Sequence, residues 1–371
     1  MPSTTALLLS GGGARGAYQA GVLQAIAEIT KATASPFGII SGLSAGAING
    51  MWLASGAEDF TAATTRMAEL WSTIRTDDIF VTDGGYLVRH GLKWIEVFAT
   101  GNFFVEKSPS FIFDTSPLRK YLSAHIDFPA IERNRKKGIL SGISVSATNY
   151  QHGRAASFFQ AGRGVKEWQL HSHYGEKAIL NVDHVMASSA LPVFFKPQRV
   201  GNADYGDGGI GLKAPLSPAI RLGADRILAI GIQSPYEISR KREPYHPATL
   251  GDVSGTLLNS ILFGSLNDDV ERCRSRNKIV RKHPDMKKEF REIPLLTIFP
   301  SRDLGQVGSN QFSHIPFGLR HLLKGFGISN KKSWDLLSYL AFNHHYTGEL
   351  LKLGRADAMA RKREILKFLK P

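Results

Sequence analysis

The sequence has 371 residues, of which 43% are hydrophobic and 21% charged, a composition that excludes a disordered chain and allows a large buried core. The single cysteine excludes an intrachain disulfide, and no apolar run reaches the ~18 residues that would span a bilayer. The first residues show no basic and apolar leader pattern. We therefore expect a cytoplasmic protein without a signal peptide or a transmembrane segment.

The net charge of +14 is concentrated in the last third of the sequence. Residues 1–238 hold 22 Lys/Arg and 19 Asp/Glu, a net of +3, whereas residues 239–371 hold 24 and 13, a net of +11. Such a surface suits anionic partners, such as lipid headgroups or nucleic acid, or is a solvated face without a partner. Because the basic tail lacks interleaved aromatic residues and any known reader motif, we expect no nucleic-acid partner.

The first 235 residues alternate short apolar runs with segments of helical periodicity. Runs typical of buried strands lie at residues 7–9, 37–40, 143–147 and 227–232. Apolar residues at helical spacing follow the first two of these runs. This alternation predicts an α/β fold, with a mostly parallel sheet and helices on both of its faces.

The composition changes near residue 235, where the stretch 234–247 is polar, basic and contains prolines. We therefore expect an N-terminal domain of residues 1–235. Residues 236–371 would form a basic, mostly helical C-terminal region with one strand near 295–300.

An amphipathic segment in this C-terminal region, residues 317–328, combines leucine and phenylalanine with basic side chains. That composition suits either docking on the N-terminal domain or adsorption to an anionic membrane. Peripheral contact with an anionic membrane through the C-terminal region is therefore one expectation.

The first predicted strand runs directly into the sequence GGGARG. Gly11, Gly13 and Gly16 fit the dinucleotide-binding pattern, but no acidic residue that could hold a ribose lies about 20 positions further on, near residues 35–38. A glycine-rich turn can instead present backbone N–H groups to a developing oxyanion. Arg15 beside it would bind a phosphate or carboxylate of a substrate, or else lie on the surface.

The sequence GLSAG, residues 42–46, matches the G-x-S-x-G nucleophile elbow. In that motif the serine lies at a tight turn from strand to helix, and the two glycines, Gly42 and Gly46, allow the strand and the helix to pack closely. A predicted strand precedes the motif and a predicted helix follows it. Ser44 is therefore the candidate nucleophile, at a helix N-terminus that favours negative charge.

A nucleophilic serine needs a base, and none of the twelve histidines has a telling sequence context. We expect four of them, His171, His173, His344 and His345, to face solvent. A carboxylate is the other option, and Asp207 precedes two glycines, Gly208 and Gly209, just ahead of a predicted strand. A second Asp-Gly-Gly sequence at 83–85 is interpreted as a turn.

The motifs GGGARG, GLSAG and DGG, in this order over about 200 residues, resemble those of the patatin-like phospholipases. The sequences ASSALPVFFKP (187–197) and FDTSPL (113–118) are similar to further segments of that family. The resemblance covers residues 6 to 232 and implies a three-layer α/β/α fold. The tail is similar to the C-terminal extension of a bacterial subgroup.

The resemblance implies a Ser–Asp dyad, with Ser44 as the nucleophile and Asp207 as the base, and requires no metal or cofactor. An aspartate with an ordinary pKa near 4 is a weak base. A preorganised oxyanion hole would lower the barrier, and desolvation would also raise the pKa of the carboxyl. The N–H donors of the oxyanion hole would come from Gly11, Gly12, Gly13 and Gly16.

The implied activity is that of a serine lipid acyl hydrolase, of phospholipase A or lysophospholipase type, which releases fatty acid through an acyl-enzyme. The substrate would be a phospholipid or another acyl-ester lipid. Two alternatives stay open: a hydrolase or acyltransferase for small soluble esters or thioesters, and a catalytically silent lipid-binding protein. The apolar stretch 101–113 would be an acyl channel, a lid or core packing.

Overall fold

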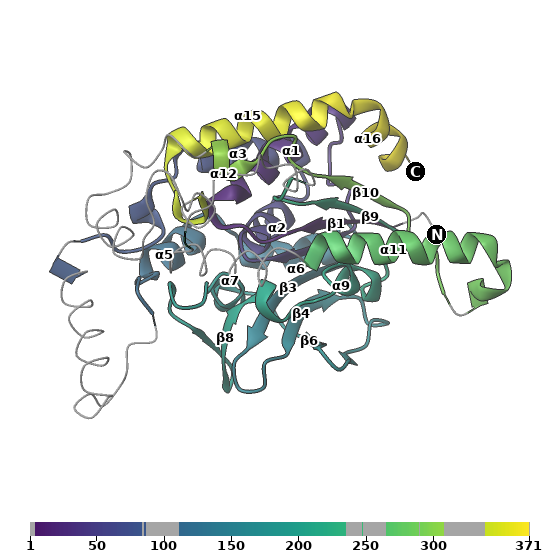
Figure 1. The fold of residues 1–371 in the computed structure, drawn as a ribbon, viewed down its shortest axis with the longest axis horizontal. Coiled ribbons are helices and arrows are strands. Elements are labelled where there is room, and N and C mark those ends of the chain that lie inside the picture. Colours follow the sequence, from purple (N-terminus) through teal and green to yellow (C-terminus); the bar gives the residue numbers. More distant parts are fainter. Residues whose placement is uncertain are drawn as a thin grey trace.

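A mixed β-sheet runs through the centre of the molecule, between two layers of helices (Figure 1). The structure is a computed structural model, and it describes residues 4–83, 85–86, 111–234, 247, 265–288, 290–307 and 338–370. Three segments with sequence expectations lie outside these ranges: most of the stretch 234–247, residues 101–110 of the apolar stretch, and the amphipathic segment 317–328.

Five strands form the parallel part of the sheet, in the order β10-β9-β1-β2-β3. They are β1 (Thr5–Leu9), β2 (Ile39–Leu43), β3 (Gly142–Asn149), β9 (Arg226–Ile230) and β10 (Leu295–Ile298). Every residue of the central strands β1 and β2 is buried, as expected for a parallel sheet covered on both faces. The predicted parallel sheet and the predicted strand near 295–300 are both confirmed.

Beyond β3 the sheet becomes mixed, because β3 pairs antiparallel with two strands. The remaining strands are β4 (Ala155–Ala161), β5 (Trp168–Gln169), β6 (His173–Lys177), β7 (Gln198–Val200) and β8 (Ala203–Asp207). β4 continues the sheet toward β6 and β5, whereas β8 pairs with the last residues of β3 and with β7. This branch carries the end of β8 to the carboxyl end of β3.

The two faces of β1 belong to different apolar clusters. Leu7 and Leu9 pack in the cluster that contains α1 (Gly16–Thr30), α2 (Ala45–Ser55) and α3 (Phe60–Thr73). Ala6 and Leu8 point to the opposite face, where α9 (Leu216–Arg221) and α11 (Ser265–Lys282) pack. The alternation of side chains along a strand thus produces the α/β/α layering, which confirms the predicted fold class.

Shorter helices complete the two layers. They are α5 (Ser116–His125), α6 (Phe128–Lys136), α7 (Val182–Ser188), α8 (Gly208–Gly211), α12 (Leu304–Val307) and α16 (Lys362–Leu369), with 3-10 turns at Gly13–Arg15, Thr76–Asp78 and Pro284–Lys288. Among the described residues, none of the helices combines the length and apolar character that crossing a bilayer requires.

The C-terminal region shares the sheet and the core of the N-terminal part. Its strand β10 pairs with β9, and α15 (His344–Ala360) lies against α1 and α3 (Figure 1). A Cβ atom on Gly21 would lie 2.1 Å from the carbonyl oxygen of Leu351, and one on Gly354 would lie 2.1 Å from that of Tyr18. The two helices therefore approach backbone to backbone at a pair of glycines, one on each helix.

Candidate active site

Ser44 lies at the turn between β2 and α2, as the elbow motif predicts. Its φ of 54° and ψ of −129° fall in a region that residues other than glycine rarely adopt, with a typical cost of ~1–3 kcal/mol. A Cβ atom on Gly42 would lie 2.3 Å from the carbonyl oxygen of Gly46, and one on Gly46 would lie 2.2 Å from that of Leu9. Only glycine fits at both positions, which lets the strand and the helix hold this strained turn.

Asp207 ends β8, where it pairs with Ala147 of β3. Its N–H donates to the carbonyl of Ala190 at 2.9 Å, and the Thr148 hydroxyl donates to its carbonyl at 2.7 Å. A Cβ atom on Gly208 would lie 2.2 Å from the carbonyl oxygen of Ser146, so the chain after Asp207 runs directly against β3. Backbone contacts on both sides thus fix the aspartate.

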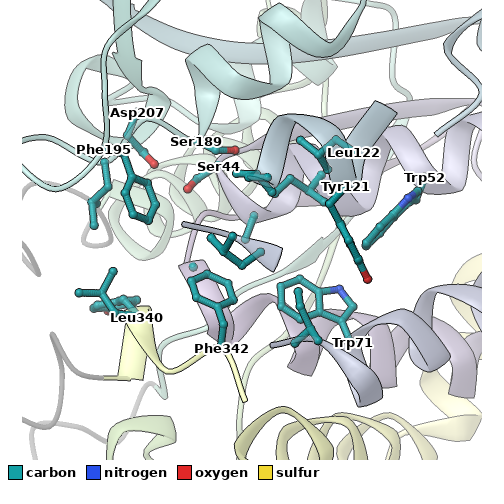
Figure 2. Close-up of a pocket in the computed structure, with 18 residues that line it drawn as sticks. Ser44, Trp52, Trp71, Tyr121, Leu122, Ser189, Phe195, Asp207, Leu340 and Phe342 are labelled. Atoms are coloured by element: carbon teal, nitrogen blue, oxygen red, sulfur yellow. The ribbon is translucent and has the colours of Figure 1, made fainter. Parts of the chain in front are cut away.

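The side chains of Ser44 and Asp207 lie close together at the cavity (Figure 2). The carboxylate of Asp207 accepts hydrogen bonds from the hydroxyl of Ser44 and from the N–H of Gly209, the latter at 2.8 Å. Asp207 is only 3% exposed. This burial raises the pKa of its carboxyl from 3.8 to about 6, and the two hydrogen bonds, which favour the ionised form, offset part of the effect. At neutral pH the group is ionised, yet it is a stronger base than an exposed aspartate.

The glycine turn lies against the elbow, but its residues face different surroundings. A Cβ atom on Gly11 would lie 3.0 Å from that of Ser44, one on Gly12 would touch Ile232, and one on Gly16 would touch the side chain of Ala45. Gly13, with a φ of 53°, lines the same cavity as Ser44. Within the described residues, no acceptor is bonded to the N–H groups of Gly11, Gly12, Gly13 or Ala45.

The expectation that Arg15 binds substrate is corrected by its position. Arg15 is 1% exposed, and its guanidinium donates to the Ser338 hydroxyl at 2.8 Å and to the Tyr339 hydroxyl at 3.0 Å. It also lies 4.2 Å from the centre of the Tyr339 ring. The side chain of Arg15 is therefore bound to the C-terminal region. The alternative expectation, that Arg15 lies on the surface, is wrong as well.

An apolar cavity of about 40 Å³ opens beside Ser44 and Asp207 (Figure 2). Its walls include Ile48, Trp52, Trp71, Leu122 and Phe195. Three further side chains come from the stretch just before α15, namely Tyr339, Leu340 and Phe342. The volume accommodates a few water molecules, so a longer apolar ligand requires these side chains to move.

Two serines at this site were not predicted from the sequence. The hydroxyl of Ser188 accepts a hydrogen bond from the N–H of Ser44 at 2.8 Å and donates to the carbonyl of Ser146 at 2.6 Å, so it ties the elbow to β3. Ser189 lines the cavity, and its buried hydroxyl has no hydrogen-bond partner among the residues that the structure describes. Buried hydroxyls in proteins are normally paired, so this orphan group indicates a place for a ligand or water atom. The segment ASSALP is the only sequence feature that points to these two serines, and it does not indicate where their side chains lie.

No histidine lines the cavity among the residues that the structure describes. The expectation that His173 faces solvent is wrong: it is 3% exposed in β6, and its Nε2 lies 3.0 Å from the Ser217 hydroxyl. Burial lowers the pKa of its imidazole. His171, His344 and His345 are exposed, as is Asp83 of the second Asp-Gly-Gly sequence.

A family model described as patatin-like phospholipase matches residues 7–220. A search of curated protein sequences gives no match. Among solved structures the chain is similar to VipD from Legionella pneumophila, with 14% identity and a TM-score of 0.35 over 95% of this chain and 67% of VipD. It is also similar to the type III effector protein ExoU, with 13% identity and a TM-score of 0.32 over 95% of this chain and 54% of ExoU. These scores are too low to carry an argument about function.

Proposed function

The chain belongs to the patatin-like phospholipase family, and on that premise we propose that it is a serine lipid acyl hydrolase in which Ser44 and Asp207 carry the chemistry. The observation that carries the proposal is the hydrogen bond from the Ser44 hydroxyl to a buried, desolvated carboxylate beside an apolar cavity. A nucleophile, a base and a place for an acyl chain thus adjoin one another.

In the first half of the proposed reaction, the Ser44 oxygen attacks the carbonyl carbon of an acyl ester while its proton passes to Asp207. The negative charge that develops on the carbonyl oxygen would be met by N–H groups of the glycine turn and of Ala45, which follows the nucleophile. Gly13 is the best placed of the turn residues, because it lines the cavity with Ser44. The intermediate then collapses, and the leaving alcohol takes the proton from Asp207.

In the second half, water attacks the acyl-Ser44 ester. Asp207 accepts a proton from the water and returns one to the Ser44 oxygen as the fatty acid leaves. A pKa of about 6 suits both directions of proton transfer near neutral pH.

The proposal is tested by fatty-acid release from phospholipid vesicles and hydrolysis of a short-chain nitrophenyl ester. Ser44→Ala and Asp207→Asn should both abolish activity in folded protein. Asp204→Asn is a matched control, because Asp204 lies on the same strand but is exposed. Activity that survives Ser44→Ala would refute the mechanism, and a wild type inactive on every ester would support a silent lipid-binding protein instead.

An esterase or acyltransferase for small soluble esters or thioesters is the second candidate, and the cavity volume of about 40 Å³ favours it. The ratio of vesicle hydrolysis to short-ester hydrolysis distinguishes the two candidates.

Peripheral membrane contact remains a prediction for the basic C-terminal region. Its helix α11 carries six exposed basic side chains: Arg272, Arg274, Arg276, Lys278, Arg281 and Lys282. Co-flotation of the protein with anionic vesicles, but not with neutral ones, would support the contact; equal recovery with both would contradict it.

A further inference from the structure

A short stretch of the C-terminal region, residues 338–342, closes one side of the cavity. Tyr339, Leu340 and Phe342 line the cavity, although almost 300 residues separate them from Ser44 in the sequence. Figure 2 shows Leu340 and Phe342 across the cavity from Ser44 and Asp207. The stretch lies outside residues 7–220, which match the family model, so this chain supplies this side of its cavity from its own C-terminal region.

Arg15 fixes the beginning of the stretch. Its hydrogen bonds to Ser338 and Tyr339 are both buried, and the hydroxyl of Tyr346 in α15 is hydrogen-bonded to Arg15 and Ser338 as well. Hydrogen bonds to a charged group are stronger than neutral ones, so a buried guanidinium with several acceptors holds the side chains of Ser338 and Tyr339 firmly.

Phe342 fixes the end of the stretch. The Thr76 hydroxyl donates to the carbonyl of Phe342 at 3.0 Å, and the Phe342 ring stacks on that of Trp71 with 6.5 Å between centroids and 16° between planes. Trp71 in turn donates its indole N–H to Asn49 of α2 at 2.8 Å. Both ends of the stretch are therefore anchored to the helices around Ser44.

The stretch also touches the glycine turn. A Cβ atom on Gly13 would lie 2.3 Å from the carbonyl oxygen of Tyr339, so the two backbones are in direct contact. Arg15, two residues after Gly13, binds the same tyrosine. The wall of the cavity and the turn beside the nucleophile are thus held in one arrangement.

From these contacts we infer that residues 338–342 form the end wall of an acyl pocket and that Leu340 and Phe342 limit the length of the acyl chain. The inference rests on the proposed function, and it deepens it by assigning acyl-chain selectivity. A chain attached to Ser44 must extend through the apolar cavity toward Phe342. The space that these two side chains fill then decides how many methylene groups are buried.

The test measures kcat/KM for nitrophenyl esters with acyl chains of 4 to 16 carbons. In the wild type, kcat/KM should rise with chain length and stop rising where the chain meets Phe342. Phe342→Ala should extend the rise to longer chains, so that kcat/KM for the longer esters increases relative to that for the shorter esters of the same variant, by up to about fourfold per added methylene. Leu340→Ala should act in the same direction, and Phe342→Leu is a milder variant in case Phe342→Ala does not fold.

Two control variants separate the wall from loss of core packing. Phe37 is fully buried against Phe60 and Leu350 is fully buried in α15, but neither lines the cavity. Phe37→Ala and Leu350→Ala should lower stability and leave the length at which kcat/KM stops rising unchanged. If Phe342→Ala changes every ester by the same factor, as the controls would, the wall assignment is overturned.

A binding assay distinguishes failure of this inference from failure of the proposed function. Saturated fatty acids of the same lengths would displace a fluorescent fatty acid from the Ser44→Ala protein, with and without Phe342→Ala. If Phe342→Ala moves the preferred length although the wild type hydrolyses no ester, the wall stands and the proposed function fails. If esters are hydrolysed and the preferred length is the same in both proteins, the proposed function stands and the wall fails.

Discussion

Burial of the Asp207 carboxyl predicts a pH dependence of both the stability and the activity of the protein. Because its pKa is raised from 3.8 to about 6, the folded state holds this proton more tightly than the unfolded state. The associated stability is therefore fully present below pH 3.8 and is lost as the pH rises through 6. One pKa unit corresponds to about 1.4 kcal/mol, so at pH 7.5 the ionised carboxylate costs about 3 kcal/mol.

Asp207→Asn keeps the shape of the side chain and removes the titration. We expect the variant to be more stable than the wild type by up to about 3 kcal/mol at pH 7.5, and by about half as much at pH 5. Urea unfolding followed by circular dichroism at the two pH values measures both differences. The informative quantity is the decrease of this stability difference from pH 7.5 to pH 5. Changes in hydrogen bonding alter the free energy of unfolding equally at both pH values and therefore cancel.

The same group should control the rate in the wild type. If Asp207 accepts the proton of Ser44, kcat/KM falls below pH 6 and reaches about a tenth of its plateau at pH 5. A stability difference that does not narrow at pH 5, together with a kcat/KM independent of pH between 5 and 7.5, would refute the assigned pKa and the role of Asp207 as base.

Three further variants, with a fourth as a control, test the surroundings of Ser44 and the packing of α15. Ser188→Ala removes the acceptor of the Ser44 N–H and should lower kcat by about tenfold or more with little change in KM, whereas an unchanged kcat would mean that the strained turn holds without it. Ser189→Ala removes an orphan hydroxyl and should raise the free energy of unfolding by ~1–3 kcal/mol while lowering turnover; a destabilised variant would show that the hydroxyl is paired. Gly354→Ala should destabilise the protein in thermal unfolding, because the added Cβ would meet the carbonyl of Tyr18. Gly348→Ala in the same helix is the control: its Cβ would lie in open space, so it should stabilise the protein by up to ~1 kcal/mol. Equal effects of the two variants would contradict the close crossing of α1 and α15.

The parts of the site that could be predicted from the sequence are those with short-range determinants. The elbow is complete within residues 42–46, and its geometry follows from the need for glycine at two close contacts. Asp207 was identified by the two glycines after it and by a family resemblance. Its pairing with β3 depends on a branch of the sheet that no periodicity reveals.

The predictions that were wrong, and the site residues that were not predicted, concern side chains whose partners are distant in the sequence. Arg15 is hydrogen-bonded to residues 323 and 324 positions away, and His173 to a serine 44 positions away. Nothing within a helical or strand period of either residue records such a partner. The cavity wall at residues 338–342 could not be predicted from the sequence for the same reason.

The position of the cavity wall has a consequence for synthesis on the ribosome. When residues 1–235 have emerged, all three sequence motifs exist, but β10, the wall and α15 have not been made. Until then the guanidinium of Arg15 lacks the partners that bury it, and α1 exposes the face that α15 later covers. The pocket is therefore completed late: a nascent chain that already contains Ser44 and Asp207 still lacks residues 338–342, the wall to which we assign the selection of the acyl chain.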